Sequence, residues 1–326
     1  MKKILIVCLA LLVLACKEDR IKHPGRLPDS VGKYNHLTLI MNDSLWIGSS
    51  GDSIRKYLAA PLDGLPQEEP QFSIVQFSPR IFVDKNRLSR NIIVFSDKSN
   101  CLFTLERSKY ATPQNIFTIN APSASELIDE FRFNVDSIVS TIKKLELNEM
   151  QHAISRGSKI NMERITDLFG VKMMIPSDYK YVFEEDDFIW LKKEVASGNS
   201  NLLFYEVPIS RIDNKNDKIS NIIQVKDSIG KTYIHGTVPN SFMKTDEGYS
   251  PFIKKIVLDQ MEVKELRGTW DMINNFMNGP YICYVFKDEY YNRYLFVEGF
   301  TYYPSNSKRD LLFELEAIIK TIKFHE

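Results

Sequence analysis

The sequence has few of the cysteines and histidines that usually hold zinc, and it has no excess charge of either sign. Its 326 residues include four cysteines and five histidines, and neither a C-x-x-C nor an H-E-x-x-H motif occurs. Lysine and arginine total 42, as do aspartate and glutamate. No basic block is available to neutralise phosphates. The sequence therefore predicts no zinc site, no other cofactor and no nucleic-acid partner.

Motifs of the common catalytic classes are also missing. A phosphate-binding loop needs a glycine five positions before Gly230-Lys231-Thr232, and that position is Val225. Ser-x-x-Lys occurs repeatedly along the chain, but the K-T-G or K-S-G strand and the G-x-S-x-G motif of serine enzymes are absent. The adjacent acidic residues 184–187 are typical of a solvated hairpin tip rather than a calcium site. We therefore assign no catalytic residue.

The longest apolar run lies at the N-terminus and is too short to cross a bilayer. Residues 4–15 follow Lys2 and Lys3, whereas a spanning helix needs about 20 apolar residues. This pattern predicts an export signal. Val13-Leu14-Ala15-Cys16 resembles the lipobox of bacterial lipoproteins, which implies cleavage before Cys16 and a diacylglyceryl anchor in the membrane on its thiol. The alternative is an ordinary secretory peptide with a chance cysteine.

The residues after Cys16 are charged and then rich in turn formers. Lys17, Glu18 and Asp19 resemble the Lys-acidic-acidic export signal of surface lipoproteins of Bacteroidetes, and a merely solvated linker is the alternative. The resemblance implies an outer-membrane lipoprotein of the cell envelope, with surface exposure left open. Of the cysteines, Cys101 and Cys283 remain for the fold, either as one disulfide or as free thiols.

The sequence pattern predicts four segments and an α+β fold. Residues 1–15 are expected to form the lipoprotein signal, 16–33 a flexible tether, 34–156 an N-terminal α+β domain and 157–326 a C-terminal α+β domain. Ser123 and Glu126 predict a capping box for a long helix that runs to about residue 154. Apolar spacing predicts further helices over residues 52–60, 160–169, 215–229 and 305–322.

Most of the remaining segments read as strands separated by short polar turns. We expect two domains of mainly antiparallel sheet covered by helices, each ending in a long amphipathic helix. In the C-terminal domain, one face of the sheet is expected to pack on helices. The predicted strands of this domain include residues 202–207, 253–258, 263–270, 281–287 and 294–302.

Three segments of the N-terminal half carry a resemblance to a known family. Residues 42–46, 51–55 and 61–70 look like the uncharacterised Bacteroidetes lipoproteins of the DUF4837 family, over nearly all of the mature chain. The family implies location and lineage but no activity. The strand at residues 296–304 and the helix around Lys308 are more loosely similar to the close of PsbP-like and Mog1-like α/β/α folds, and fold alone does not give function.

Two groups of side chains are candidates for a functional surface. Residues 63–70 form a loop in which prolines and a glycine fix the shape around three carboxylates, although a rigid turn with solvated charge is the simpler interpretation. Tryptophans could stack on sugars or on a partner, although aromatics in strands are more often core. The loop candidates are Asp63, Gly64, Gln67, Glu68 and Glu69, and the aromatic candidates are Trp46, Trp190 and Trp270.

These observations predict a non-catalytic lipoprotein of the cell envelope that binds a ligand or takes part in assembly. Its partner would be an envelope protein or a glycan. The rival hypothesis is an envelope hydrolase of glycan or peptidoglycan-like substrates that uses Asp63, Glu68 or Glu69. That hypothesis requires at least one of these carboxylates to lie in a concave pocket with a raised pKa.

Overall fold

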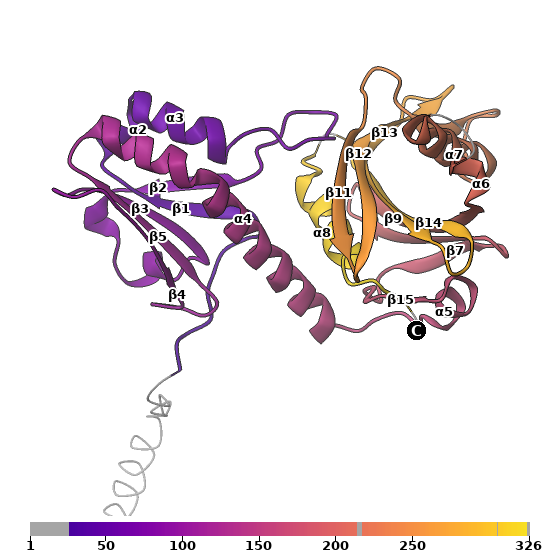
Figure 1. Ribbon diagram of the computed structural model, residues 1–326, viewed down its shortest axis with the longest axis horizontal. Helices are drawn as coiled ribbons and strands as arrows, with labels where there is room; N and C mark the ends of the chain where they lie inside the picture. The colour runs from indigo at the N-terminus through magenta and orange to yellow at the C-terminus, as the bar shows by residue number, and fades with distance from the viewer. Residues whose placement is uncertain (1–25, 214–216, 305, 325–326) are drawn as a thin grey trace, which may run out of the picture.

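The N-terminal half forms a twisted five-stranded sheet with helices packed against it (Figure 1). The computed structural model describes residues 26–213, 217–304 and 306–324. The sheet has the strand order β2-β1-β3-β5-β4. Helices α3 and α4 pack on one of its faces. The elements are β1 (His36–Ile40), α2 (Asp43–Ile47), α3 (Ser49–Leu58), β2 (Ser73–Phe77), β3 (Asn91–Asp97), β4 (Leu102–Arg107), β5 (Asn115–Ala121) and α4 (Ala124–Arg156), with 3₁₀ turns at Pro79–Ile81 and Asp84–Arg87.

Most strand pairs in the chain are antiparallel and the α+β class is confirmed, but the N-terminal sheet departs from the expected pairing. Strand β1 pairs in parallel with β2 and β3, and β3 pairs in parallel with β5; only β4 and β5 are antiparallel. The sequence predicted short polar turns between these strands and mainly antiparallel pairing. In the structure the chain crosses over between parallel neighbours, through α2 and α3 from β1 to β2, through the 3₁₀ turns from β2 to β3 and through β4 from β3 to β5.

Helix α4 begins as its sequence predicts and runs slightly further. Ser123 is the N-cap, and its side chain accepts a hydrogen bond from the backbone N–H of Glu126, which satisfies one of the free donors at the helix start. The helix continues to Arg156 and carries its apolar face from Leu127 to Ile154. Its last turns extend beyond the N-terminal sheet toward the other half of the chain (Figure 1).

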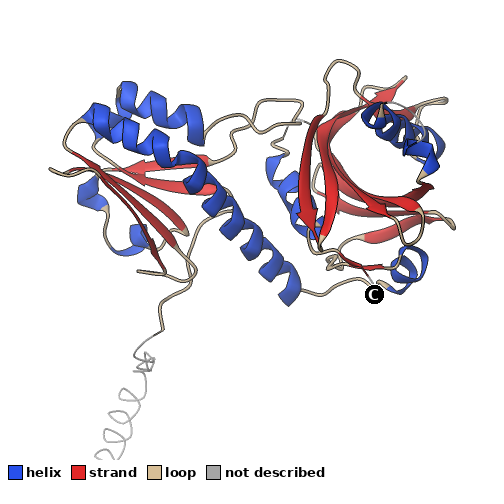
Figure 2. Ribbon diagram, in the orientation of Figure 1, coloured by secondary structure: helices blue, strands red, loops and turns tan. Residues whose placement is uncertain are grey.

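The C-terminal half is built on a strongly curled antiparallel sheet (Figure 2). Its strand order is β10-β12-β13-β14-β9-β8-β7, and β11 pairs with the free part of β12. A small pair, β15 with β6, lies apart from it. The elements are α5 (Glu163–Phe169), β6 (Val171–Lys172), β7 (Lys180–Glu184), β8 (Phe188–Val195), β9 (Gly198–Pro208), α6 (Ser210–Asp213), α7 (Lys218–Tyr233), β10 (Phe242–Thr245), β11 (Phe252–Leu258), β12 (Met261–Ile273), β13 (Asn278–Asp288), β14 (Arg293–Tyr302), α8 (Arg309–Ile319) and β15 (Lys323–Phe324).

Both faces of this sheet are buried, whereas the sequence led us to expect one. Along β13, Ile282 and Tyr284 belong to the core on the α8 side, while Cys283 and Val285 belong to the core on the α7 side. Successive side chains of a strand point to opposite faces, so an unbroken apolar run fills two cores. The sequence interpretation placed only the terminal helix on the sheet, whereas α7 covers the opposite face.

Candidate functional site

Helix α4 joins the two halves by packing its last turns into the core of the C-terminal domain. Ile154 belongs to that core, and Leu147 and Met150 pack against it. The Gln151 side-chain amide donates a hydrogen bond of 3.1 Å to the carbonyl of Ala317 in α8. The helix is therefore shared by both domains, and the space beside it is walled by both.

The loop between α3 and β2 makes the second connection. Its two ends are held together because the N–H of Leu62 donates to the Glu69 carbonyl at 2.9 Å. Its tip reaches the C-terminal domain, where Leu65 packs against the core. Gly64 has φ +81°, and a Cβ atom there would lie 2.8 Å from Cβ of Arg267. A glycine is needed at this position both for the backbone conformation and for the close approach.

Glu69 lies at the end of this loop and caps α8 of the other domain. Its carboxylate accepts hydrogen bonds from the backbone N–H groups of Lys308, at 2.7 Å, and Arg309, at 3.0 Å, and from the Ser307 hydroxyl. A carboxylate at a helix N-terminus satisfies free donors and interacts favourably with the helix dipole. Glu69 is thus a structural residue of the domain junction, and its oxygens are engaged rather than open to a substrate.

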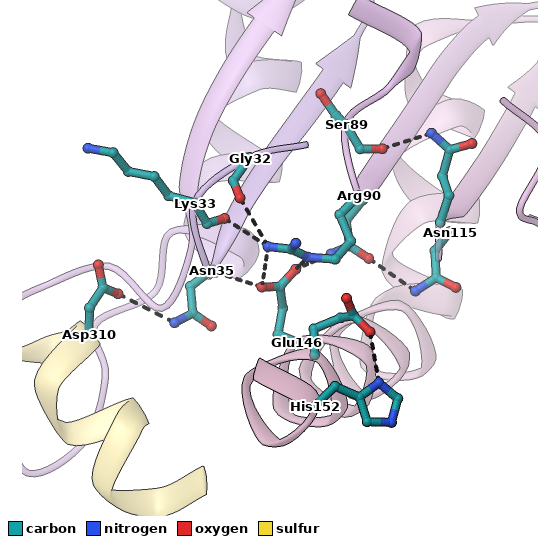
Figure 3. Close-up of polar contacts among 12 residues, drawn as sticks. Gly32, Lys33, Asn35, Ser89, Arg90, Asn115, Glu146, His152 and Asp310 are labelled. Atoms are coloured by element: carbon teal, nitrogen blue, oxygen red, sulfur yellow. Dashed lines mark hydrogen bonds and ion pairs between the residues drawn. The ribbon is translucent and has the colours of Figure 1, made fainter. Parts of the chain in front are cut away.

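A third contact fastens the start of the N-terminal domain to α4 (Figure 3). The buried carboxylate of Glu146 accepts hydrogen bonds from Arg90 Nε at 2.9 Å, from Asn91 at 2.6 Å and from the backbone N–H of Asn35 at 3.1 Å. Burial raises the pKa of Glu146, and the hydrogen bond and charge of Arg90 oppose that shift. The side-chain amide of Asn35 reaches Asp310 in α8 at 3.5 Å, so this network also touches the C-terminal domain.

These contacts enclose a cleft of about 560 Å³ between the two domains, which we call the inter-domain cleft. Cavities of this size at domain junctions are the usual places for small ligands. Its walls come from the loop before β2, α4, β11, β12 and α8. The lining residues are Asn35, Leu62, Asp63, Gln71, Lys143, Lys144, Leu147, Phe252, Ile253, Lys254, Ile256, Glu265, Arg267, Arg309, Phe313, Glu316 and Lys320.

Part of the charge in the cleft forms a closed network between β12 and α8. Arg267 pairs with Glu265 at 2.7 Å and with Glu316 at 2.8 Å, and Lys320 also pairs with Glu316. Burial alone would raise the pKa of Glu316, but the charges of Arg267 and Lys320 outweigh it and hold the pKa at about 2. At neutral pH this carboxylate is ionised and fully occupied by its two cations.

Three lysines of the cleft stand outside this network. Across the described ranges, no carboxylate lies within 4 Å of the ammonium groups of Lys143, Lys144 or Lys254. Desolvation by the cleft walls lowers the pKa of Lys143, and the charge of Glu316 opposes that shift more strongly than Arg267 adds to it. The Lys143 side chain is still exposed to solvent, so the desolvation is partial and the ammonium remains available to an anion.

The other loop candidates divide between cleft and solvent. Asp63 lines the inter-domain cleft, and Gln67 and Glu68 are exposed. Sequence reasoning missed Lys143, Lys254 and the pair Arg267–Glu316. Nothing in the local sequence distinguishes these side chains from ordinary surface charges on a helix or an edge strand, because the cleft exists only when the two domains meet.

The tryptophans do not form one surface. Trp270 is 1% exposed and belongs to the core under α7, so the expectation of a surface role is wrong for this residue. Trp190 packs at the edge of the same core and donates a hydrogen bond to Asn201. Trp46 lies in the other domain, half-buried beneath the Arg55 guanidinium at 4.3 Å. A large aromatic in a sheet with two buried faces is drawn into a core.

Several sequence expectations concern cysteines, metals and membranes. Cys101 is exposed and Cys283 is buried, and both are free thiols. Within residues 26–213, 217–304 and 306–324, no three His, Cys, Asp or Glu side chains converge as a metal site. No helix in the described part of the chain is long and apolar enough to span a bilayer. Cys16 and the Lys17, Glu18 and Asp19 signal lie outside the described residues.

Comparison with known proteins gives two family matches that divide the chain. Residues 30–155 match a domain of unknown function, DUF8532, and residues 158–321 match another, DUF4837. The segments 42–46, 51–55 and 61–70, from which the resemblance to DUF4837 was read, thus lie in the half that matches DUF8532. The DUF4837 match is also narrower than nearly the whole mature chain.

Similarity beyond these families is low. No curated protein matches the sequence. Among solved structures, the solution structure of cyanobacterial PsbP (CyanoP) from Synechocystis sp. PCC 6803 is similar over 48% of this chain and 87% of that chain, with 6% sequence identity and a TM-score of 0.32. The family assignment therefore rests on the sequence model that matches residues 158–321, half of the chain. The chain belongs to the DUF4837 family.

Proposed function

We propose that the protein is a non-catalytic binding lipoprotein of the cell envelope, and that its ligand occupies the inter-domain cleft. The observation that carries this proposal is the cleft itself, about 560 Å³ at the junction of two domains, with three lysines that have no carboxylate partner among the described residues. A cleft with an excess of positive charge concentrates anions, and a bound anion would neutralise these lysines.

The chemistry of the lining supports binding rather than hydrolysis. A glycosidase needs a protonated carboxylic acid beside a second carboxylate. In the cleft, Glu316 is held ionised by Arg267 and Lys320, and Glu265 is bound by Arg267 and by the Tyr284 hydroxyl at 3.0 Å. Asp63 is the remaining carboxylate of the lining, so it has no second free carboxylate to work with there. The lining residues include no serine, cysteine or histidine that could act as nucleophile or base.

The binding proposal can be tested on the natural protein. Native mass spectrometry of the chain extracted from its own membranes is expected to reveal a bound small molecule. Replacing Lys144, which is exposed and lines the cleft, by tryptophan should fill the space and remove that molecule. Ser137→Trp is the matched control, because Ser137 is exposed on the same helix and is not part of the lining. Equal occupancy in both variants would contradict the proposal.

The envelope location is a separate part of the proposal. It is supported by the apolar run before Cys16 and by the charged residues Lys17, Glu18 and Asp19. Protease digestion of intact cells should cleave the native protein and spare a variant with alanines at positions 17–19 if these residues are a surface address. A native protein that is shielded from protease would exclude surface exposure and point to periplasmic partners.

A further inference from the structure

We infer that the ligand of the inter-domain cleft is an anionic amphiphile: one carboxylate or phosphate group held by Lys143 and Lys254, with a hydrocarbon part against the apolar wall of β11 and α8. This inference rests on the proposed binding function and specifies its ligand class. It follows from three observations on the cleft, which concern its charge, its apolar wall and its shortage of neutral hydrogen-bonding groups.

The charge of the cleft calls for an anion. Six of its lining side chains are cationic and three are anionic, an excess of three positive charges. Glu265 is not available to Lys254, although the two residues lie directly opposite each other in the β11–β12 register. Glu265 is already held by Arg267 at 2.7 Å and by Tyr284 at 3.0 Å. Because charges in a partly desolvated cleft interact more strongly than in water, a ligand anion between the lysines would be favoured.

The apolar wall is exposed without a protein partner. Phe252 and Ile253 are 52% and 37% exposed. Phe313 of α8 is half-buried, and the centroid of its ring lies 6.1 Å from the centroid of the Tyr34 ring. Among the described strands β11 pairs only with β12, so it forms an edge of the sheet. Side chains from both of its faces, including Ile253 and Ile256, line the cleft. A hydrocarbon chain along this edge would remove apolar surface from water.

The cleft has few groups with which to bind a neutral polar molecule. Its neutral polar side chains are Asn35 and Gln71. The Gln71 amide already donates to the Tyr57 carbonyl at 2.6 Å, and the Asn35 amide points to Asp310. A sugar would leave many hydroxyl groups without partners here. The combination of free cations and a hydrocarbon-like wall matches an amphiphile with a single charged end.

The test uses the protein without residues 1–25, which retains both sheets and every helix described above. Isothermal titration calorimetry would measure decanoate, decyl phosphate, hexanoate and decyltrimethylammonium. We expect decanoate or decyl phosphate to bind, and the preferred one identifies the head group. Decyltrimethylammonium should bind at least tenfold more weakly. Each methylene contributes roughly fourfold in affinity, so hexanoate should bind about two orders of magnitude more weakly than decanoate.

Variants separate the cleft from general surface charge. The double substitution Lys143→Gln and Lys254→Gln should weaken binding of the preferred anion at least tenfold. Lys255→Gln should leave it unchanged, because Lys255 is the neighbouring residue on β11, pairs with Glu262 at 3.2 Å and does not line the cleft. Phe252→Ala should weaken binding several-fold. All four side chains are exposed, and thermal unfolding would verify that the variants remain folded.

The outcomes distinguish this inference from the proposed function. If no decyl anion binds while native mass spectrometry still finds a molecule that Lys144→Trp removes, the ligand class is wrong and the binding function stands. Equal affinity for decyltrimethylammonium, or equal losses in Lys255→Gln and in the double variant, would also overturn the ligand class. If neither experiment detects a ligand, both proposals fail.

Discussion

The carboxylate of Glu69 accepts a hydrogen bond from the backbone N–H of Arg309 at 3.0 Å, across 240 residues of sequence. The Arg309 guanidinium returns the contact by donating to the Pro70 carbonyl at 3.0 Å. One loop thus supplies the cap of a helix that belongs to the other domain. The walls of the inter-domain cleft depend on this exchange, because α8 and the loop before β2 both line it.

Replacing Glu69 by alanine is expected to lower the free energy of unfolding by about 2 kcal/mol. The substitution removes a helix cap and its interaction with the helix dipole, and it leaves buried N–H groups without acceptors. Urea denaturation would measure the change. Glu68→Ala is the matched control, since Glu68 is exposed, and it should change stability by less than about 0.5 kcal/mol. Similar losses in both variants would mean that the cap contributes nothing.

Gly64→Ala should destabilise the junction more than Gly32→Ala does. Both glycines have positive φ, +81° and +123°, but only Gly64 is crowded, with Arg267 Cβ at 2.8 Å and the Gly268 nitrogen at 2.9 Å from an added Cβ. In Gly64→Ala, the backbone strain alone should lower the free energy of unfolding by about 1 kcal/mol, and the steric overlap should lower it by a further 1–3 kcal/mol or so. Thermal unfolding of the two variants would measure the difference. A smaller loss of stability in Gly64→Ala than in Gly32→Ala would show that the loop does not pack against Arg267.

Glu316 should make stability depend on acid pH. Its pKa falls from 4.5 to about 2 on folding, so its contribution is complete above pH 4.5 and is lost as the pH falls toward 2. The shift corresponds to roughly 3 kcal/mol at most. In Glu316→Gln, the free energy of unfolding should be lower at pH 6 and should fall less steeply between pH 4.5 and 2. An unchanged slope, measured by urea denaturation at several pH values, would contradict the assigned pairing with Arg267 and Lys320.

The two thiols of the folded domains should react very differently. Cys101 is exposed, whereas Cys283 is 1% exposed in the core under α7, where burial raises its pKa. Thiolates rather than thiols react with Ellman's reagent. The chain without residues 1–25 should therefore titrate one thiol when native and two in denaturant. Cys101→Ser should abolish the native reaction, and a native reaction that persists would place Cys283 nearer the surface.

Elements governed by neighbours in sequence followed their local signals. The start of α4 agreed with the predicted N-cap at Ser123, because a cap and the N–H group that it accepts from lie three residues apart. Helix α8 was expected over residues 305–322 and spans Arg309–Ile319. Its start is set by Glu69, far away in the chain, and no signal near residue 305 carries that information.

The α+β class, the apolar faces of the helices and the positions of the main strands of the C-terminal sheet follow from local sequence patterns, because each depends on residues within a single element. Three features come from long-range packing instead: the parallel register of the N-terminal sheet, the role of Glu69 as a cap and the gathering of Lys143 and Lys254 in one cleft. Strand order, distant hydrogen bonds and unpaired charges depend on which segments meet in space, and that is set by the packing of the whole chain.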